Sequence, residues 1–193
     1  MEKSSDKKDV ILQKSICLFA AKGYDGVGVQ EICSAAKITK PTLYYYFNNK
    51  AGLLQAIVAT KGHDFLNCIA LAAQFSGDFI FSLNTIINSC AHFAQENPDF
   101  FRLHCTLQTA SPNSEAAQQY LPLSQTIDEV YLNFFKKASE QIGNMRSKEI
   151  IFSRMFRQIV DSACLDLLSE STRKKNIHLQ AIVHAFAYGV VSG

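Results

Sequence analysis

Apolar residues recur at helical spacing along almost the whole chain. Near the N-terminus, Leu12, Ile16, Phe19 and Ala20 fall on one face of a segment that ends at Gly23. No segment alternates apolar and polar positions with a period of two, and Gly and Pro are sparse. The pattern therefore predicts an all-α protein of about nine helices.

Turn and cap residues divide this pattern into segments. We expect helices at about 5–23, 29–36, 39–47, 50–73, 77–96, 98–109, 114–142, 147–169 and 173–191. Pro122 should kink or restart the seventh of these. The first three resemble a long supporting helix followed by a helix-turn-helix unit, which is a common DNA-binding arrangement. We therefore predict a helix-turn-helix DNA-binding domain at 1–50 and a larger domain of helices at 51–193.

The short segment 39–47 carries an unusual surface. Thr39 can cap it, and Leu43 and Phe47, four residues apart, share its buried face. Three consecutive tyrosines follow Leu43, and the helical repeat places Tyr45 and Tyr46 on or near the exposed side together with Lys40. A helix that lies against phosphates and base edges has a use for such residues.

Charge and composition narrow the class of protein. Residues 1–50 hold eight Lys against five Asp and Glu, a net charge of +3, whereas residues 51–193 carry −1. This difference favours an anionic partner for the N-terminal part, although lysine-rich helices are often simply solvated. The six cysteines show no C-x-x-C spacing and sit among apolar neighbours, so buried free thiols are expected rather than redox or metal roles. No apolar run reaches the ~18 residues of a membrane span and no signal peptide is visible, so we expect a cytoplasmic protein with no membrane contact.

The run Thr42-Leu43-Tyr44-x-x-Phe47-x-x-Lys50-x-x-Leu53-Leu54, with Gly23-Tyr24 before it, resembles the DNA-binding domain of TetR-family transcriptional regulators. The resemblance covers about residues 8–56 and implies a homodimer that binds a palindromic double-stranded DNA operator. It also implies a small-molecule effector inside the C-terminal helices. Two places depart from the family pattern. Val27-Gly28 stand where Thr or Ser usually opens the second helix, and Lys37 stands where the turn usually has Gly.

Each DNA-binding candidate has an expected role. Lys40 and Thr42 are placed for base edges, and Tyr45 for bases or a thymine methyl. Tyrosine hydroxyls and Lys50 suit phosphate oxygens, although Tyr44 could equally pack its ring on the first helix. The full set of DNA-binding candidates is Gln30, Lys37, Thr39, Lys40, Thr42, Tyr44, Tyr45, Tyr46 and Lys50.

The C-terminal part supplies two further sets of candidates. Aromatic and polar residues of its central helices could line a pocket for an apolar or aromatic effector, but the same spacing is typical of a packed core. These candidates are Phe65, Phe93, Phe101, His104, Gln108 and Tyr131. The last two predicted helices carry apolar and small residues at four-residue spacing, which suits either a four-helix dimer interface or packing within one chain. These are Ile151, Met155, Ile159, Ala181, Ala185 and Gly189.

The leading hypothesis is a DNA-binding repressor that a small molecule releases from its operator. An architectural or accessory helix-turn-helix protein without effector control is the alternative. Nothing indicates an enzyme, because the chain lacks G-x-S-x-G, H-E-x-x-H and a Gly-rich phosphate loop. His92 and His104 have no obvious third ligand, so we expect no metal and no cofactor.

Overall fold

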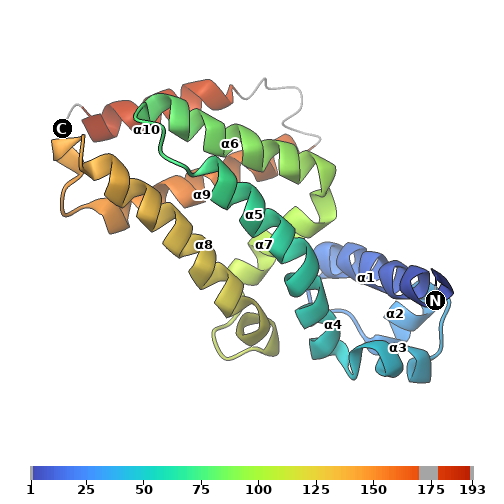
Figure 1. The fold of residues 1–193 in the computed structure, drawn as a ribbon. Helices are drawn as coiled ribbons and strands as arrows, with labels where there is room; N and C mark the ends of the chain where they lie inside the picture. The colour runs from blue at the N-terminus through green and yellow to red at the C-terminus, as the bar shows by residue number, and fades with distance from the viewer. Residues whose placement is uncertain (1, 170–177, 192–193) are drawn as a thin grey trace. The chain divides into compact units, whose positions relative to one another are not determined.

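The computed structural model describes residues 2–169 and 178–191, and every regular element in these ranges is a helix (Figure 1). The all-α prediction is confirmed. The helices are α1 Glu2–Lys22, α2 Val29–Ala36, α3 Lys40–Phe47, α4 Lys50–Ile57, α5 His63–Ala72, α6 Phe79–Glu96, α7 Pro98–Gln108, α8 Glu115–Ser139, α9 Glu149–Leu167 and α10 Leu179–Val191. A π-turn, Val58–Gly62, joins α4 to α5, and a 3-10 turn, Gly143–Met145, precedes α9. With α4 and α5 counted as one helix, the described residues form nine, the number expected.

Packing divides the chain into two compact units. One comprises Met1–His63 with Asp99–Leu123, and the other comprises Asp64–Pro98 with Ser124–Gly193. The helix-turn-helix lies in the first unit, which also includes α7 and the start of α8. The functional boundary at residue 50 stays a prediction.

The first unit is built on α1. Its residues Ile11, Ile16 and Phe19 are buried, and the helix packs against α2 and α4. Leu53 and Leu54 of α4 are fully buried in the same unit. This apolar core fixes the frame on which the short helices α2 and α3 are held (Figure 1).

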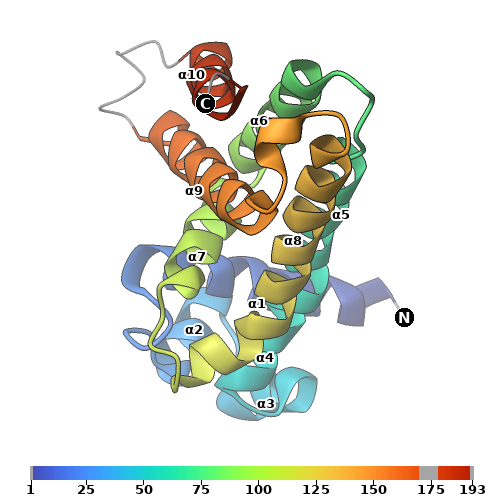
Figure 2. The same ribbon diagram turned by 90° about the vertical axis from the view of Figure 1, so that its left-hand side faces the viewer.

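The second unit has a core rich in aromatic rings. Its helix α6 packs against both α9 and α10, as the two ribbon views show (Figure 2). Phe135 of α8 lies at the centre, with ring centroids 5.1 Å from Phe134, 6.0 Å from Phe156 and 6.1 Å from Phe186. Such edge-on aromatic contacts stabilise the packing beyond the burial of their area.

One segment of the first unit differs from the sequence-based expectation. The helix expected at 50–73 contains the π-turn, which ends at Gly62. A Cβ atom at Gly62 would lie 2.5 Å from Leu123 Cδ2, so this close approach tolerates only glycine without a shift of Leu123. Thr60 Oγ1 donates to the Ala56 and Ile57 carbonyls at 2.8 and 3.2 Å, and so provides polar contacts where the regular helical pattern is interrupted.

Two further helices also differ from the expectation. The helix α8 continues through Pro122, so the predicted restart there does not occur. Residues 173–177 of the predicted final helix lie outside the described residues, and α10 begins at Leu179. None of the helices formed by the described residues combines the length and apolar character that crossing a bilayer requires.

Candidate nucleic-acid interface

The turn between α2 and α3 is closed by backbone hydrogen bonds and one side-chain cap. The α2 helix ends at Lys37, whose φ of 54° and ψ of 47° lie in the left-handed region. The Ile38 amide then donates to the Cys33 carbonyl at 2.9 Å, which completes the helix end. Thr39 caps α3 by accepting from the Thr42 amide at 3.4 Å, as the sequence predicts.

Buried and exposed residues on α3 separate cleanly. Leu43 is fully buried and Phe47 is 4% exposed, so these two residues attach α3 to the first unit. Tyr45 is 80% exposed and Tyr44 is 43% exposed, and Lys40 also lies at the surface. The exposed tyrosines are not covered by the first unit, so the helix presents aromatic and basic groups outward.

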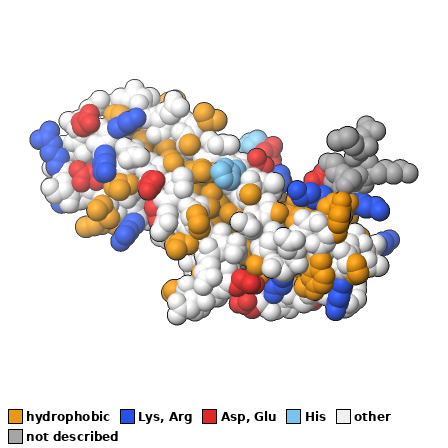
Figure 3. Space-filling model, turned by 60° about the horizontal axis from the view of Figure 1, so that its bottom comes forward, with side chains coloured by type: hydrophobic (Ala, Val, Ile, Leu, Met, Phe, Trp, Pro, Cys, Tyr) orange, Lys and Arg blue, Asp and Glu red, His pale blue; other side chains and the backbone are white. Residues whose placement is uncertain are grey.

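Residues Asn48 and Asn49 separate α3 from α4. Asn48, with φ of 60°, ends the helix, and Asn49 caps α4 by accepting from the Gly52 amide at 2.7 Å. A Cβ atom at Gly52 would lie 2.1 Å from the Phe47 carbonyl oxygen, so the turn depends on glycine there. In Figure 3, the face that carries α3 comes forward, and blue basic groups lie among orange side chains on its right-hand part.

The start of α2 has open backbone donors. Its N-cap is Gly28, which provides no side-chain hydrogen bond. The Glu31 amide donates to the Gly28 carbonyl at 3.0 Å, so the Val29 and Gln30 amides are the ones left without a cap. Lys50 Nζ donates to the Val27 carbonyl at 3.0 Å, just before this helix. A positive charge beside uncapped helix amides is an arrangement that suits a phosphate oxygen.

Every predicted DNA-binding residue lies in the first unit, on α2, on α3 or beside them. Gln30 and Lys37 are exposed on α2 and its end, whereas Thr42 and Tyr46 are half-buried. Tyr46 packs edge-on against Tyr45, with ring centroids 5.1 Å apart. Contact with DNA stays a prediction for the whole set, and the geometry is compatible with it.

Sequence reasoning missed one contact of this region. The Tyr24 hydroxyl donates to Glu115 Oε2, although the two residues are 91 positions apart in the sequence. Burial and the Glu115 carboxylate raise the pKa of Tyr24, so its phenol stays protonated and can donate. No local motif signals such a pair, because it depends on the packing of α8 against the turn before α2.

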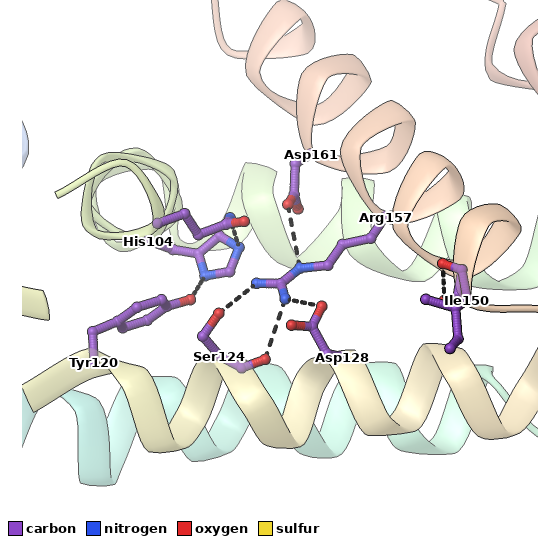
Figure 4. Close-up of polar contacts among 9 residues, drawn as sticks. His104, Tyr120, Ser124, Asp128, Ile150, Arg157 and Asp161 are labelled. Carbon is purple, nitrogen blue, oxygen red and sulfur yellow. Dashed lines mark hydrogen bonds and ion pairs between the residues drawn. The ribbon is translucent and has the colours of Figure 1, made fainter. Parts of the chain in front are cut away.

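The predicted ligand residues are divided between the two units. Phe101, His104 and Gln108 lie on α7 in the first unit, where the His104 ring hydrogen-bonds to Tyr120 through Nδ1 and contacts Gln108 through Nε2 at 2.9 Å (Figure 4). His104 is 1% exposed. These side chains therefore form a packed polar cluster, and effector binding by them stays a prediction.

In the second unit, Phe65 and Phe93 pack together with ring centroids 5.0 Å apart, and Tyr131 is buried beside Cys90. Figure 4 also shows how Arg157 of α9 reaches α8. Its Nη1 atom hydrogen-bonds to the Asp128 carboxylate at 2.5 Å and to the Ser124 carbonyl at 3.2 Å. These contacts tie α9 to α8 through a guanidinium that is 4% exposed.

The predicted dimer residues lie at the surface of the second unit. Ile151 is 58% exposed and Met155 is 49% exposed on α9, while Ala181, Ala185 and Gly189 are exposed on α10. Ile159 is half-buried between these groups and the core. The same helices bury other residues in their own unit, so the exposed face remains available to a partner.

The other chemical expectations concern thiols and metals. All six cysteines are free, and Cys33, Cys90 and Cys164 are buried. His92 is exposed and pairs with Glu96 of the same helix at 3.3 Å. The described part of the chain contains no cluster of three or more His, Cys, Asp or Glu side chains suited to hold a metal ion.

Comparisons with known proteins agree with this geometry. The profile of bacterial regulatory proteins of the tetR family matches residues 11–57, which contain α2, α3 and α4. The chain is 35% identical over 72 residues to the biofilm operon negative transcriptional regulator IcaR of Staphylococcus aureus. That match covers 37% of this chain and 38% of IcaR, so it spans less than half the length of this curated relative.

Solved structures share the fold across nearly the whole chain. The regulator FadR from Bacillus subtilis, in complex with stearoyl-CoA, is 16% identical with a TM-score of 0.71, and the match covers 95% of this chain and 97% of FadR. AibR, in complex with isovaleryl coenzyme A and operator DNA, is 19% identical with a TM-score of 0.71, covering 96% and 98% of the two chains. The profile match places residues 11–57 in the tetR family of bacterial regulatory proteins, and the solved structures show that nearly the whole chain shares their fold.

Proposed function

We propose that this protein is a sequence-specific DNA-binding transcriptional regulator that uses α3 as its recognition helix. The observation that carries the proposal is the separation of faces on α3. Leu43 and Phe47 hold the helix in the core while Tyr45 and Lys40 point outward. A short helix held in this way, after a turn and a supporting helix, can enter the major groove with its N-terminal residues at base edges.

The roles divide between base and phosphate contacts. Lys40 and Thr42, in the first turn of α3, are the base-reading candidates, with Tyr45 beside them. Lys37, Lys50 and the open amides of α2 contact phosphates on either side. Phosphate contacts fix the register of the helix, and base contacts discriminate sequence.

Titration of a labelled duplex at several salt concentrations tests this proposal. After selection of a preferred sequence from a random pool, Lys40→Ala should weaken binding and relax the sequence preference. Lys50→Ala should weaken binding to all duplexes similarly and reduce the salt slope by about one. Lys137→Ala removes the same charge from α8 and serves as the control. Unchanged affinity in both α3-region variants would refute the proposal.

The regulator acts, in this proposal, as a homodimer joined through α9 and α10. The exposed apolar residues Ile151 and Met155 on α9, with the small residues Ala181 and Ala185 on α10, support this interface. Two recognition helices must also reach half-sites about 34–36 Å apart, or a multiple of this distance, which a dimer can provide.

Light scattering tests the dimer directly. Met155→Glu places a charge in the proposed interface and should give monomers at micromolar concentration, whereas Leu71→Glu, at a 71% exposed position on α5, should not. A wild-type protein that is monomeric, or a Met155→Glu variant that remains dimeric, would contradict this assignment.

The repressor and effector assignments rest on the relatives and on the aromatic side chains of the second unit. IcaR is a negative regulator, and FadR and AibR bind acyl-CoA thioesters in their solved complexes. The aromatic side chains of the second unit suit an apolar or aromatic effector. A thermal-shift screen that includes acyl-CoA thioesters should find a compound that raises the Tm and weakens DNA binding, by linkage. DNA binding that no compound weakens would favour the accessory, effector-independent alternative. A cytoplasmic location stays a prediction.

A further inference from the structure

A hydrogen bond joins the DNA-binding region to the first turn of α8. Tyr24 lies in the turn between α1 and α2 and is 4% exposed, and its hydroxyl donates to Glu115 Oε2. Both residues belong to the first compact unit. A bond to an ionised carboxylate is stronger than one between neutral groups. The contact therefore fixes the orientation of the Tyr24 ring.

The Tyr24 ring in turn holds a lysine. Lys50 Nζ lies 4.0 Å from the centroid of this ring, within the range of a cation–π interaction. The same ammonium donates to the Val27 carbonyl at 3.0 Å. A phenol that donates to a carboxylate has a more electron-rich ring, so the Glu115 bond also strengthens the attraction for the cation. The flexible Lys50 side chain is thereby held between a ring face and a carbonyl.

The position of this ammonium matters for DNA binding. It lies at the Val27 carbonyl, directly before the uncapped N-terminus of α2 at Gly28. An ammonium has three donors, and only one is used by Val27. A phosphate at the start of α2 can then receive bonds from Lys50 and from the open amides together. Without its ring and carbonyl contacts, the lysine would have to be ordered when DNA binds, which costs side-chain entropy.

A hollow borders the Tyr24–Glu115 bond. A cavity of about 240 Å³ lies between the turn Lys22–Gly26 and the segment around Thr106 and Ala116. The Tyr24–Glu115 hydrogen bond crosses between these same two segments. The Tyr24 ring packs on Phe19 of α1, with ring centroids 5.2 Å apart, and the hydroxyl bond to Glu115 is what links it to α8.

We propose that Glu115 is a positioning residue for DNA binding, which acts through Tyr24 to hold Lys50 in place for a phosphate. This inference rests on the proposed function and extends it to α8. Glu115 opens α8, the helix whose later residues pack in the second unit. A movement of the first turn of α8 away from Tyr24 would release Lys50 and weaken DNA binding. The contact thus gives this chain a route by which α8 can influence the affinity for DNA.

The direction in which Glu115→Ala changes DNA affinity distinguishes this proposal from a general electrostatic effect. Glu115→Ala removes a negative charge, which by itself should strengthen binding to a polyanion. The positioning role predicts the opposite, a loss of affinity of roughly three- to tenfold. Tyr24→Phe should give a similar loss, whereas Glu115→Gln, which keeps an acceptor, should retain most of the affinity. Glu129→Ala, at an exposed position later in α8, is the control for charge and should bind at least as well as wild type.

A double-mutant cycle completes the test. Affinity for a fluorescently labelled mixed-sequence duplex is measured at low salt for wild type, Glu115→Ala, Lys50→Met and the double variant, with Tm values recorded for each. The loss caused by Glu115→Ala should fall below about twofold in the Lys50→Met background, because the positioned group is absent. Equal losses in both backgrounds, or no loss in either, would overturn the positioning role. A wild-type protein that fails to bind DNA would overturn the proposed function as well.

Discussion

Lys37 has a left-handed backbone conformation and an exposed side chain, so its replacement should change protein stability and DNA affinity in opposite directions. Replacement of Lys37 by Gly should increase the stability of the protein and weaken its binding to DNA. Lys37 ends α2 with φ of 54° and ψ of 47°, and its side chain is exposed. The backbone bonds that close the turn, such as that from Ile38 to Cys33, do not involve the side chain, so glycine preserves them.

The expected gain in stability follows from two opposing contributions. The left-handed conformation costs an L-residue roughly 1–2 kcal/mol, which glycine does not incur. Glycine has a more disordered unfolded state, which costs about 0.4–1 kcal/mol. The net gain should be about 0.5–1 kcal/mol, which corresponds to a rise in Tm of about 2 °C for a chain of this size.

Lys37→Ala separates the effect of backbone strain from the effect of the side-chain charge. Alanine keeps the backbone strain and removes the charge, so its stability should stay within about 0.5 kcal/mol of wild type. Both variants should lose the same phosphate contact and lower the salt slope of DNA binding by about one. Urea unfolding at a fixed protein concentration measures the stability, and duplex titration measures the affinity.

Two results would refute the reasoning. A Lys37→Gly variant that is less stable than Lys37→Ala would show that the left-handed conformation is not strained in this turn. Affinity and salt slope equal to wild type in both variants would show that the Lys37 side chain does not face DNA. The two parts are independent, so either can fail alone.

Three further outcomes are expected. Leu43→Ala should lower the free energy of unfolding by about 2–5 kcal/mol because Leu43 is fully buried. Tyr45→Ala, at an 80% exposed position, should change it by less than about 0.5 kcal/mol. Similar losses for both variants in urea unfolding would contradict the assignment of Leu43 to the buried face of α3. Arg157→Ala leaves Asp161, which is 6% exposed, without its guanidinium neighbour and should lower the free energy of unfolding by about 3–5 kcal/mol. A loss below about 1 kcal/mol in the same assay would contradict a stabilising role for Arg157 between α8 and α9. Burial raises the pKa of Cys164 from 9.0 to about 12, so the folded state keeps a proton that the unfolded chain releases, and stability should fall as the pH rises from 9 to 12. Cys164→Ala should flatten that part of the pH curve, and identical curves for the two proteins would rule out this linkage.

Local sequence signals predicted the capping and the buried and exposed faces of α3 well. The Thr39 cap, the buried pair Leu43 and Phe47, and the exposed Tyr45 all follow from short-range rules of capping and helical periodicity. Lys37, which stands where the turn usually has Gly, has a positive φ, as helix ends of this type require. These features depend on residues close together in the sequence.

Long-range features were not accessible in the same way. The Tyr24–Glu115 bond joins residues 91 positions apart, and the π-turn at Gly62 depends on Leu123 from another helix. A regular hydrophobic pattern also gave no reason to place α7 and the start of α8 in the same unit as α1. The ligand candidates share an aromatic pattern, but that pattern fits a core and a pocket equally, so periodicity alone does not distinguish them.

The exposed tyrosines of α3 have a spectroscopic consequence. The chain contains seven tyrosines and no tryptophan, so its intrinsic ultraviolet emission comes from tyrosine alone. Four of the seven lie between positions 24 and 46, and Tyr45 is the most exposed of the large apolar side chains, whereas Tyr120 and Tyr131 are buried. Quenching by a water-soluble agent should therefore act on Tyr44 and Tyr45 of α3 and on Tyr188 of α10, which is 58% exposed. The protein carries its own unlabelled optical probe on the surface that we assign to DNA.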